Sequence, residues 1–329
     1  MNIVELKSEG LYCAAGDFYL DPWRPVERAV ITHGHGDHAR TGSKNYFASH
    51  SSRDILLHRL GPVNLTSFAF GETFSLGDAK ISFHPAGHVL GSAQVRVEVN
   101  GEVWVVSGDY KRSPDASCEP FEVVPCDTFI SEATFALPVY AWPPTSTVAE
   151  EILEWWQGYP QGPSILFAYA FGKTQRILAE LARLTDRRVY LHGACHELTE
   201  IYRRNGIRLV PTALVSEQEK SYDFSGDLIL APPSGHRSAW MKRFKHPQTA
   251  FASGWMQIRG NRRRCGYERG FVLSDHADWK DLISTILATG AKKILLTHGN
   301  TDVLVRYLKE ELQLNCQPLA TQFEGEAEA

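Results

Sequence analysis

Residues 32–39 read THGHGDHA and follow directly on the apolar run RAVI at residues 28–31. The stretch alternates glycines with four side chains that can bind a metal ion, namely His33, His35, Asp37 and His38. Imidazole nitrogens are good zinc ligands, and the glycines at positions 34 and 36 let the backbone fold closely around an ion. The stretch therefore predicts a loop at the end of a β-strand that binds a divalent metal ion.

Further imidazole and carboxylate side chains stand where other strand-like runs end. They are His88 in HPAGHVLGSA, Asp109 in VVSGDY, His276 in LSDHADW and His298 in ILLTHGN. One such histidine alone is usually an ordinary hydrogen-bonded residue. Because open α/β architectures gather their functional sites along the edge where strands end, the whole set predicts one metal site assembled from several strands.

The secondary-structure pattern of the sequence changes twice along the chain. Up to about residue 140 it consists of short β-rich runs separated by turns: FYLD, RAVIT, KISFHPA, AQVRVEV, EVWVVSG and DTFISEA. Strand-like and helix-like segments then alternate, starting with TVAEEILEWWQGY, where Thr147 and Glu150 have the spacing of a helix-capping pair. Strand-like runs then return in GFVLSDHADW and KKILLTHGN. The pattern predicts one fold, built from residues 1–140 and 271–329, that is interrupted by an inserted domain at 141–270.

Bulk properties restrict the class of protein. With 329 residues and 43% hydrophobic content, the chain can bury a substantial core, and its net charge of −4 argues against a uniformly basic nucleic-acid coat. The six cysteines form no Cys-x-x-Cys pair, so neither a disulfide framework nor a zinc ribbon is expected. The first residues lack the apolar centre of a signal peptide, and no window has the roughly 18 apolar residues of a membrane span. We therefore expect a cytoplasmic protein with no membrane partner.

Two further charged motifs have a functional and an ordinary interpretation. FGKTQRIL contains Gly-Lys-Thr, but a phosphate-binding loop would need glycine five positions before Gly172, where Phe167 stands. Lys173 and Arg176 would instead face a nucleic-acid backbone or lie on a solvated helix face. The second motif is an arginine-rich run containing Arg259, Arg262, Arg263 and Arg264. We favour phosphate binding over a solvated charge run, because three adjacent arginines repel one another unless they share an anion.

The metal-loop motif belongs to a wider pattern. HGHGDH, AGHVLGSA and SGDY, in this order, resemble the metallo-β-lactamase superfamily, while Glu132 in SEATF, His276 and His298 resemble the additional motifs of the β-CASP nucleases. The stretches GDFYLDPWRPVERAVITH, HPAGHVLGSAQV, VWVVSGDYK, APPS, FASGWMQIRG, RRR and GFVLSDHADW are similar to those of bacterial DNA ligase-associated exonucleases. The resemblance extends from about residue 10 to 310. It implies an α/β protein, an αββα metallo-β-lactamase sandwich with an inserted β-CASP cap domain.

The resemblance also implies a role for each site residue. One zinc ion would be bound by His33, His35 and His88, and the other by Asp37, His38 and His298, with Asp109 bridging the two. The residues implied in catalysis are Asp37, His276, Glu132 and Asp21. Asp21 and Glu132 would orient ligating imidazoles, as carboxylates around metal sites do, and His276 would contact the scissile phosphate.

The implied activity is that of a di-zinc DNA exonuclease in DNA repair, with Mn²⁺ as an alternative metal. Similar proteins are encoded beside an ATP-dependent DNA ligase and a helicase, which implies a functional link to both. The main alternative is an RNA-processing β-CASP ribonuclease, because DNA-processing relatives such as Artemis usually have valine at the position of His298. A small-molecule hydrolase is disfavoured by the inserted cap, and a catalytically inactive binding protein is disfavoured by the intact ligand set.

Overall fold

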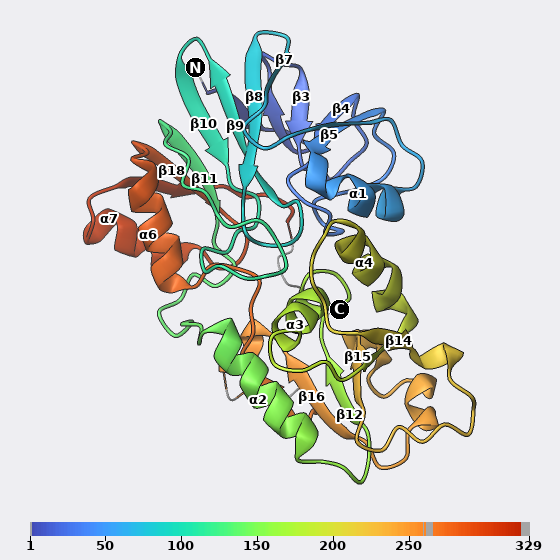
Figure 1. The fold of residues 1–329 in the computed structure, drawn as a ribbon. Helices are drawn as coiled ribbons and strands as arrows, with labels where there is room; N and C mark the ends of the chain where they lie inside the picture. The colour runs from blue at the N-terminus through green and yellow to red at the C-terminus, as the bar shows by residue number, and fades with distance from the viewer. Residues whose placement is uncertain (1, 259, 261–265, 324–329) are drawn as a thin grey trace. The chain divides into compact units, whose positions relative to one another are not determined.

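The computed structural model describes residues 2–258, 260 and 266–323. The chain forms two compact units, and the second, made of residues 115–117 and 142–275, interrupts the first in the sequence. Both units mix helices and strands (Figure 1). No helix in the described part of the chain is both long enough and apolar enough to cross a membrane.

The first unit contains two sheets. In one, six strands pair in chain order: β1 (Val4–Leu6), β2 (Leu11–Cys13), β3 (Phe18–Leu20), β4 (Arg28–Val30), β5 (Asn45–Ser49) and β6 (Leu65–Phe68). The other has the strand order β19 (Asn315–Pro318), β18 (Lys293–Thr297), β11 (Thr128–Glu132), β10 (Glu102–Val106), β9 (Ala93–Val99), β8 (Ala79–Pro85) and β7 (Thr73–Leu76). Strands β10, β11 and β18 pair in parallel, so the residues that follow them emerge at the same edge of the sheet.

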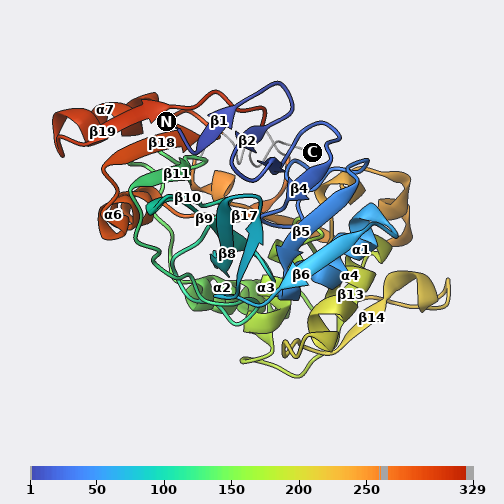
Figure 2. The same cartoon turned by 90° about the horizontal axis from the view of Figure 1, so that it is seen from above.

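Side-chain alternation along the strands explains how the layers of the first unit pack. Val30 of β4 and Ile130 of β11 belong to one apolar core that the two sheets share. Their neighbours Ala29 and Phe129 point the opposite way, because successive strand residues face opposite sides of a sheet. Ala29 joins a core with α1 (Arg53–Leu60), and Phe129 joins one with α6 (Trp279–Thr289) and α7 (Asp302–Glu310). In Figures 1 and 2, α1 accordingly lies beside β5, and α6 lies beside β11.

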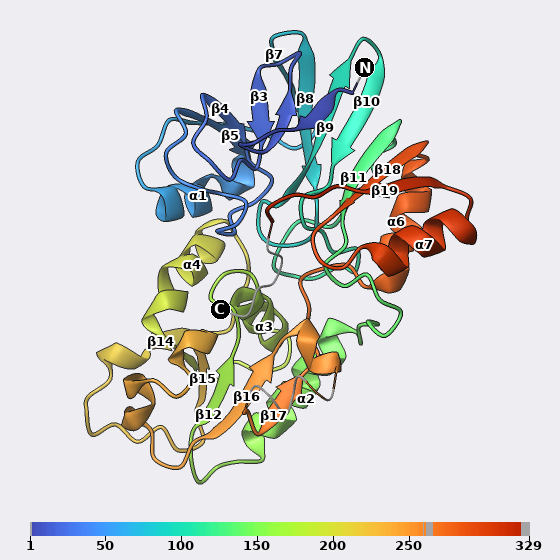
Figure 3. The same cartoon turned by 180° about the vertical axis from the view of Figure 1, so that it is seen from behind.

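The second unit is built on a six-stranded sheet in which every pairing is parallel. Its strand order is β14 (Thr212–Leu214), β13 (Val189–Leu191), β15 (Leu228–Ala231), β12 (Ser164–Phe167), β16 (Gln248–Ala252) and β17 (Arg269–Phe271). The helices are α2 (Thr145–Gln157), α3 (Lys173–Leu181) and α4 (Gly193–Arg204), seen from behind in Figure 3. All three contribute to one core with Leu166 of β12.

The start of α2 corrects one expectation. The helix begins at Thr145 with Pro144 at its N-cap position, so Thr147 lies inside the first turn and does not cap the helix. The prolyl ring already fixes a backbone angle close to the one that a helix needs, and the helix therefore starts three residues earlier than the Thr147–Glu150 spacing predicts.

Candidate metal centre

The histidine-rich loop lies between β4 and β5. Its backbone turns tightly at His35, whose carbonyl oxygen accepts hydrogen bonds from the N–H groups of His38, at 3.2 Å, and Ala39, at 2.8 Å. This turn directs the side chains of His33, His35 and His38 toward the edge where β8, β10 and β18 end.

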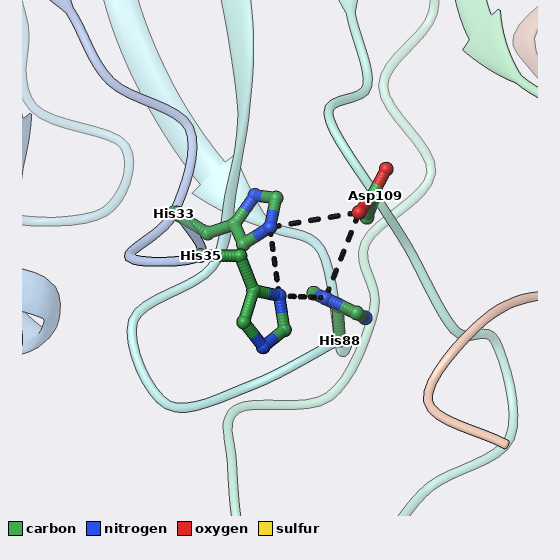
Figure 4. Close-up of side chains that lie close together, drawn as sticks. All are labelled: His33, His35, His88 and Asp109. Atoms are coloured by element: carbon green, nitrogen blue, oxygen red, sulfur yellow. Dashed lines mark hydrogen bonds and ion pairs between the residues drawn. The ribbon is translucent and has the colours of Figure 1, made fainter. Parts of the chain in front are cut away.

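A first group of donor atoms combines this loop with the residues after β8 and β10. It consists of His33, His35, His88 and Asp109, shown in Figure 4, and one ligand atom from each lies within 4.8 Å of the others. The Nδ1 atom of His35 lies 3.1 Å from Nε2 of His33 and 3.0 Å from Nε2 of His88. The Oδ2 atom of Asp109 lies 3.5 Å from Nε2 of His33 and 3.8 Å from Nε2 of His88.

A second group shares Asp109 with the first. Asp37, His38 and His298 bring one ligand atom each within 4.8 Å of one another. The Nε2 atoms of His38 and His298 are 3.3 Å apart. Asp109 faces both of these histidines, with Oδ2 at 3.5 Å from Nε2 of His38 and Oδ1 at 3.5 Å from Nε2 of His298. The Asp109 carboxylate therefore lies between the two groups.

The donor atoms fit metal ions better than they fit one another. A ring nitrogen has either one proton or one lone pair, so Nδ1 of His35 cannot make good hydrogen bonds to two imidazoles at once. Oδ1 of Asp109 is buried and accepts no hydrogen bond from the described residues. Buried polar atoms are normally satisfied, and imidazole and carboxylate ligands in this arrangement suit zinc. The convergence of these atoms therefore indicates a site for cations.

Asp21 fixes which nitrogens of two histidines face the centre. Its carboxylate accepts hydrogen bonds from the Thr32 N–H at 2.7 Å and from Nδ1 of His38 at 2.7 Å. The Thr32 hydroxyl also donates to Asp21, at 2.5 Å, so its oxygen is left to accept from Nδ1 of His33 at 3.0 Å. With both Nδ1 atoms used as donors, Nε2 of each histidine is the nitrogen that faces the centre.

The electrostatic environment favours neutral imidazoles at two of these positions. Burial lowers the pKa of His33 well below its usual value, and the neighbouring imidazole of His38 lowers it further. Burial likewise lowers the pKa of His298 to about 4, although Asp109 opposes this shift. Only a neutral imidazole has a lone pair for a metal ion, so both histidines are ready to bind one near neutral pH.

Glu132 and His276 form a buried pair next to these groups. Oε2 of Glu132 accepts hydrogen bonds from Nδ1 of His276 at 2.8 Å and from the Thr134 hydroxyl at 2.5 Å, and Oε1 accepts from the Tyr110 N–H at 2.6 Å. Burial raises the pKa of Glu132, and the charge of Asp109 adds to that effect. Glu132, His276 and Asp109 could also group around an ion. Because both Glu132 oxygens already accept protein hydrogen bonds, we interpret Glu132 as the residue that holds His276 in place.

No protein-family model matches the chain. A protein of Opitutus terrae named "Probable DNA ligase" is 31% identical over 92% of this chain, and the chain spans 30% of that protein's length. An "RNase J-like protein" of Methanocaldococcus jannaschii is 22% identical over 87% of this chain and 79% of its own length. Integrator complex subunit 11 of Danio rerio is 33% identical over 30% of this chain and 16% of its own length.

These relatives are members of one group. That group is the metallo-β-lactamase/β-CASP group, and this chain is similar to its members. A solved structure of an Enterococcus faecalis protein of unknown function has the same fold, with a TM-score of 0.60 at 10% identity over 90% of this chain and 80% of that one.

Lys173 departs from its expected place on the surface of the protein. It is fully buried, and its ammonium lies 3.4 Å from Oδ2 of Asp275 and 4.5 Å from the centre of the Tyr169 ring. Arg176 is also buried, with Nε donating to Asp115 at 2.6 Å and Nη1 donating to the Ser274 carbonyl at 2.9 Å. Because carboxylates within the second unit already balance both charges, this placement does not support the expectation that Lys173 binds a phosphate.

The expected phosphate contacts Arg259, Arg262, Arg263 and Arg264 lie outside the described residues. The structure adds a different cation beside the metal loop, Arg59 at the end of α1. A Cβ atom at Gly36 would lie 3.0 Å from Nη2 of Arg59, so the guanidinium rests against this loop. The structure also places Phe323, which the sequence did not predict, at the centre, where its ring stacks on two histidines. No pattern in the sequence links position 59 or 323 to the loop, and only the fold brings them together.

Proposed function

We propose that this chain is a metal-dependent DNA exonuclease that hydrolyses phosphodiester bonds at DNA ends, with a role in DNA repair. The observation that carries the proposal is the convergence of two sets of donor atoms on the buried carboxylate of Asp109. Relatives named as an RNase J-like protein and as endoribonucleases support nuclease chemistry. The ligase-named relative, which is similar along 92% of this chain, supports DNA as the substrate.

Two zinc ions would be held by the centre. His33, His35 and His88 would bind one, and Asp37, His38 and His298 would bind the other, with Asp109 bridging. When bound, such a pair supplies positive charge that polarises a phosphodiester and makes water a better nucleophile. Mn²⁺ is the alternative, because imidazole and carboxylate ligands accept several divalent metals.

The chain's own residues would divide the remaining work. Asp21 holds the imidazoles of His33 and His38 so that Nε2 of each points inward. Glu132 accepts a hydrogen bond from Nδ1 of His276, which fixes the orientation of that imidazole beside the centre. From there His276 would donate a proton to the departing sugar oxygen or a hydrogen bond to the scissile phosphate.

We further propose that the layers of the first unit are the αββα metallo-β-lactamase sandwich and that the second unit is the β-CASP cap, with 141–270 as its extent. Arg259, Arg262, Arg263 and Arg264 would bind the DNA backbone. A functional link to an ATP-dependent DNA ligase is supported by the name of the Opitutus relative. The link to a helicase and the cytoplasmic location rest on the resemblance in the sequence alone.

An RNA-processing β-CASP ribonuclease is the second candidate. Two observations favour it: the names of several relatives, and the histidine at position 298, which resembles RNA-processing members of the group. These relatives match shorter parts of this chain or have lower identity than the ligase-named protein, so we rank DNA first.

One experiment tests both candidates. DNA and RNA strands of the same sequence, labelled at either end, are incubated with the zinc- or manganese-loaded protein and with an Asp109→Ala variant. We expect the DNA label to be released progressively by the wild type and retained with the variant. Faster cleavage of the RNA would favour the ribonuclease, and cleavage of neither strand would contradict nuclease function.

A further inference from the structure

The C-terminal part of the described chain, residues 319–323, returns to the metal centre along β18. The Leu319 N–H donates to the carbonyl oxygen of Leu296 at 2.7 Å, and the hydroxyl groups of Thr321 and Thr297 are hydrogen-bonded. Leu319 and Phe323 also pack against the apolar core that the two sheets of the first unit share. This tail is therefore attached to the strand whose end carries His298.

The ring of Phe323 lies parallel to two imidazoles of the centre. Its centroid is 4.7 Å from that of His38, with an angle of 4° between the planes, and 4.7 Å from that of His298, with an angle of 6°. The ring centroids of Trp23 and Phe323 are 5.7 Å apart, and the two ring planes make an angle of 80°. The indole N–H of Trp23 is itself fixed by a 2.7 Å hydrogen bond to the Ser8 carbonyl oxygen. Trp23 thus contacts the Phe323 ring, which stacks on both histidines.

His298 lacks the support that a ligating histidine usually has. The ring nitrogen that does not bind the metal normally donates to a carboxylate or carbonyl, and this bond fixes the ring. Nδ1 of His38 has such a partner in Asp21, whereas Nδ1 of His298 is buried and has no hydrogen-bond partner among the described residues. The backbone of His298 is also in the left-handed region, at φ 63°, which a non-glycine residue rarely adopts. Among the described residues, the contacts that orient this ring are therefore those with its faces.

We propose that Phe323 is a positioning residue that holds the imidazole of His298, and with it that of His38, by stacking on the ring faces. Metal binding uses the lone pair in the plane of an imidazole, and stacking uses its face, so one ring does both. The apolar ring also excludes water from that side of the centre. This inference rests on the proposed metal binding and assigns the tail to the half of the centre formed by Asp37, His38 and His298.

The test is a competition titration of the metal-free full-length protein with Zn²⁺, together with the visible absorption of the Co²⁺-loaded form. Phe323→Ala should weaken one of the two binding steps by about 10-fold or more, as loss of an outer support does, and leave the other step unchanged. It should also alter the Co²⁺ spectrum. Phe323→Leu tests the same point if the alanine variant unfolds, because leucine keeps the apolar contacts without a flat face. Phe323→Tyr should restore wild-type behaviour.

Phe70→Ala is the matched control. Phe70 is a half-buried phenylalanine that packs against the same core, and it stacks on none of the described histidines. We expect this variant to bind both ions as the wild type does. Unchanged binding by the alanine and leucine variants of Phe323, or an equal weakening of both steps, would overturn the proposal. Failure of the wild type itself to bind two ions would refute the proposed function and this inference with it, whatever the variants do.

Discussion

Each unit buries a cluster of charged side chains, and the two clusters differ in how their atoms are matched. In the second unit, Arg176 donates to Asp115, to the Ser274 carbonyl and to Asp275, and Lys173 adds a second cation beside Asp275. In the first unit, imidazole nitrogens face one another at 3.0 to 3.3 Å, and Asp109 has a carboxylate oxygen without a hydrogen bond from the described residues.

The comparison separates a structural cluster from a functional one by chemistry alone. Buried charges that are paired and hydrogen-bonded need no ligand from outside the protein, and removing one partner lowers the stability of the fold. Imidazole and carboxylate lone pairs that converge on a common space suit a bound cation, so they indicate a binding site. Substitutions in the paired cluster of the second unit should therefore change stability, and substitutions among the donor atoms of the first unit should change activity.

The largest effect is expected from removing a ligand. Asp37→Ala and His38→Ala should each lower the rate of DNA cleavage by about 10³-fold or more, because a metal ion contributes several kcal/mol to stabilising the transition state. The melting temperature of the metal-free variants should remain close to that of the metal-free wild type. The control is His84→Ala, since His84 bonds to Ser82 and lies near Glu122 instead of facing the centre. Near wild-type cleavage by the Asp37 or His38 variant would disprove the ligand assignment.

The next effect concerns His276, which lies beside the ligands and which we do not assign as one. Expelling a sugar alkoxide needs a proton, and general acid catalysis contributes about 10²–10⁴-fold, so His276→Ala should lose that much DNA cleavage. It should lose far less on a nitrophenyl phosphodiester, whose leaving group needs no proton, and it should retain both metal ions. Equal losses on the two substrates would favour transition-state stabilisation over proton donation. Loss of a metal ion would make His276 a ligand.

The next prediction concerns stability and Arg176, in the paired cluster of the second unit. Arg176→Met should lower the free energy of unfolding of the protein by about 3–5 kcal/mol, because it removes the guanidinium that the buried carboxylates of Asp115 and Asp275 contact. Zinc content should not change. Arg183→Met, two residues beyond the end of α3, is the control: the Arg183 side chain is 64% exposed, so loss of its ion pair with Glu180 should cost at most about 1 kcal/mol. Similar unfolding curves for the two variants would show that the Arg176 cluster is not a structural one.

The smallest effect is expected from the arginine run, a third kind of charge cluster. Replacing Arg262, Arg263 and Arg264 together with alanine should weaken DNA binding and reduce the slope of log affinity against log salt by roughly three units, one for each lost phosphate contact. Binding measured across a salt series checks this. A slope equal to that of the wild type would identify the run as a solvated charged surface.

The sequence predicted those strands whose side chains alternate between apolar and polar or are all buried. Every residue of β11 is buried, because its side chains enter cores on both faces of the sheet, and this is why TFISE reads as a strand. Short strands with half-exposed side chains, such as β6 and β7, have no comparable pattern and were not predicted. The donor residues could be predicted as a set, because parallel strands carry the residues that follow them to one edge.

Long-range pairing explains what the sequence could not predict. Lys173 looked like a surface cation at the start of a helix, and only the fold reveals Asp275 beside its ammonium. Arg59 and Phe323 reach the centre from α1 and from the C-terminal tail, far in the sequence from the loop that they contact. The role of a charged or aromatic side chain depends on the residue that it contacts, and tertiary structure determines which residue that is.

The central claim is that the converging donor atoms of the first unit hold two bridged metal ions. The most direct test is a crystal of the zinc-loaded protein, measured at the zinc absorption edge, with elemental analysis of the same sample. The account predicts close to two zinc ions per chain and two anomalous peaks, one among His33, His35 and His88 and one among Asp37, His38 and His298, with Asp109 between them. A single peak, or a peak between Glu132 and His276, would contradict it.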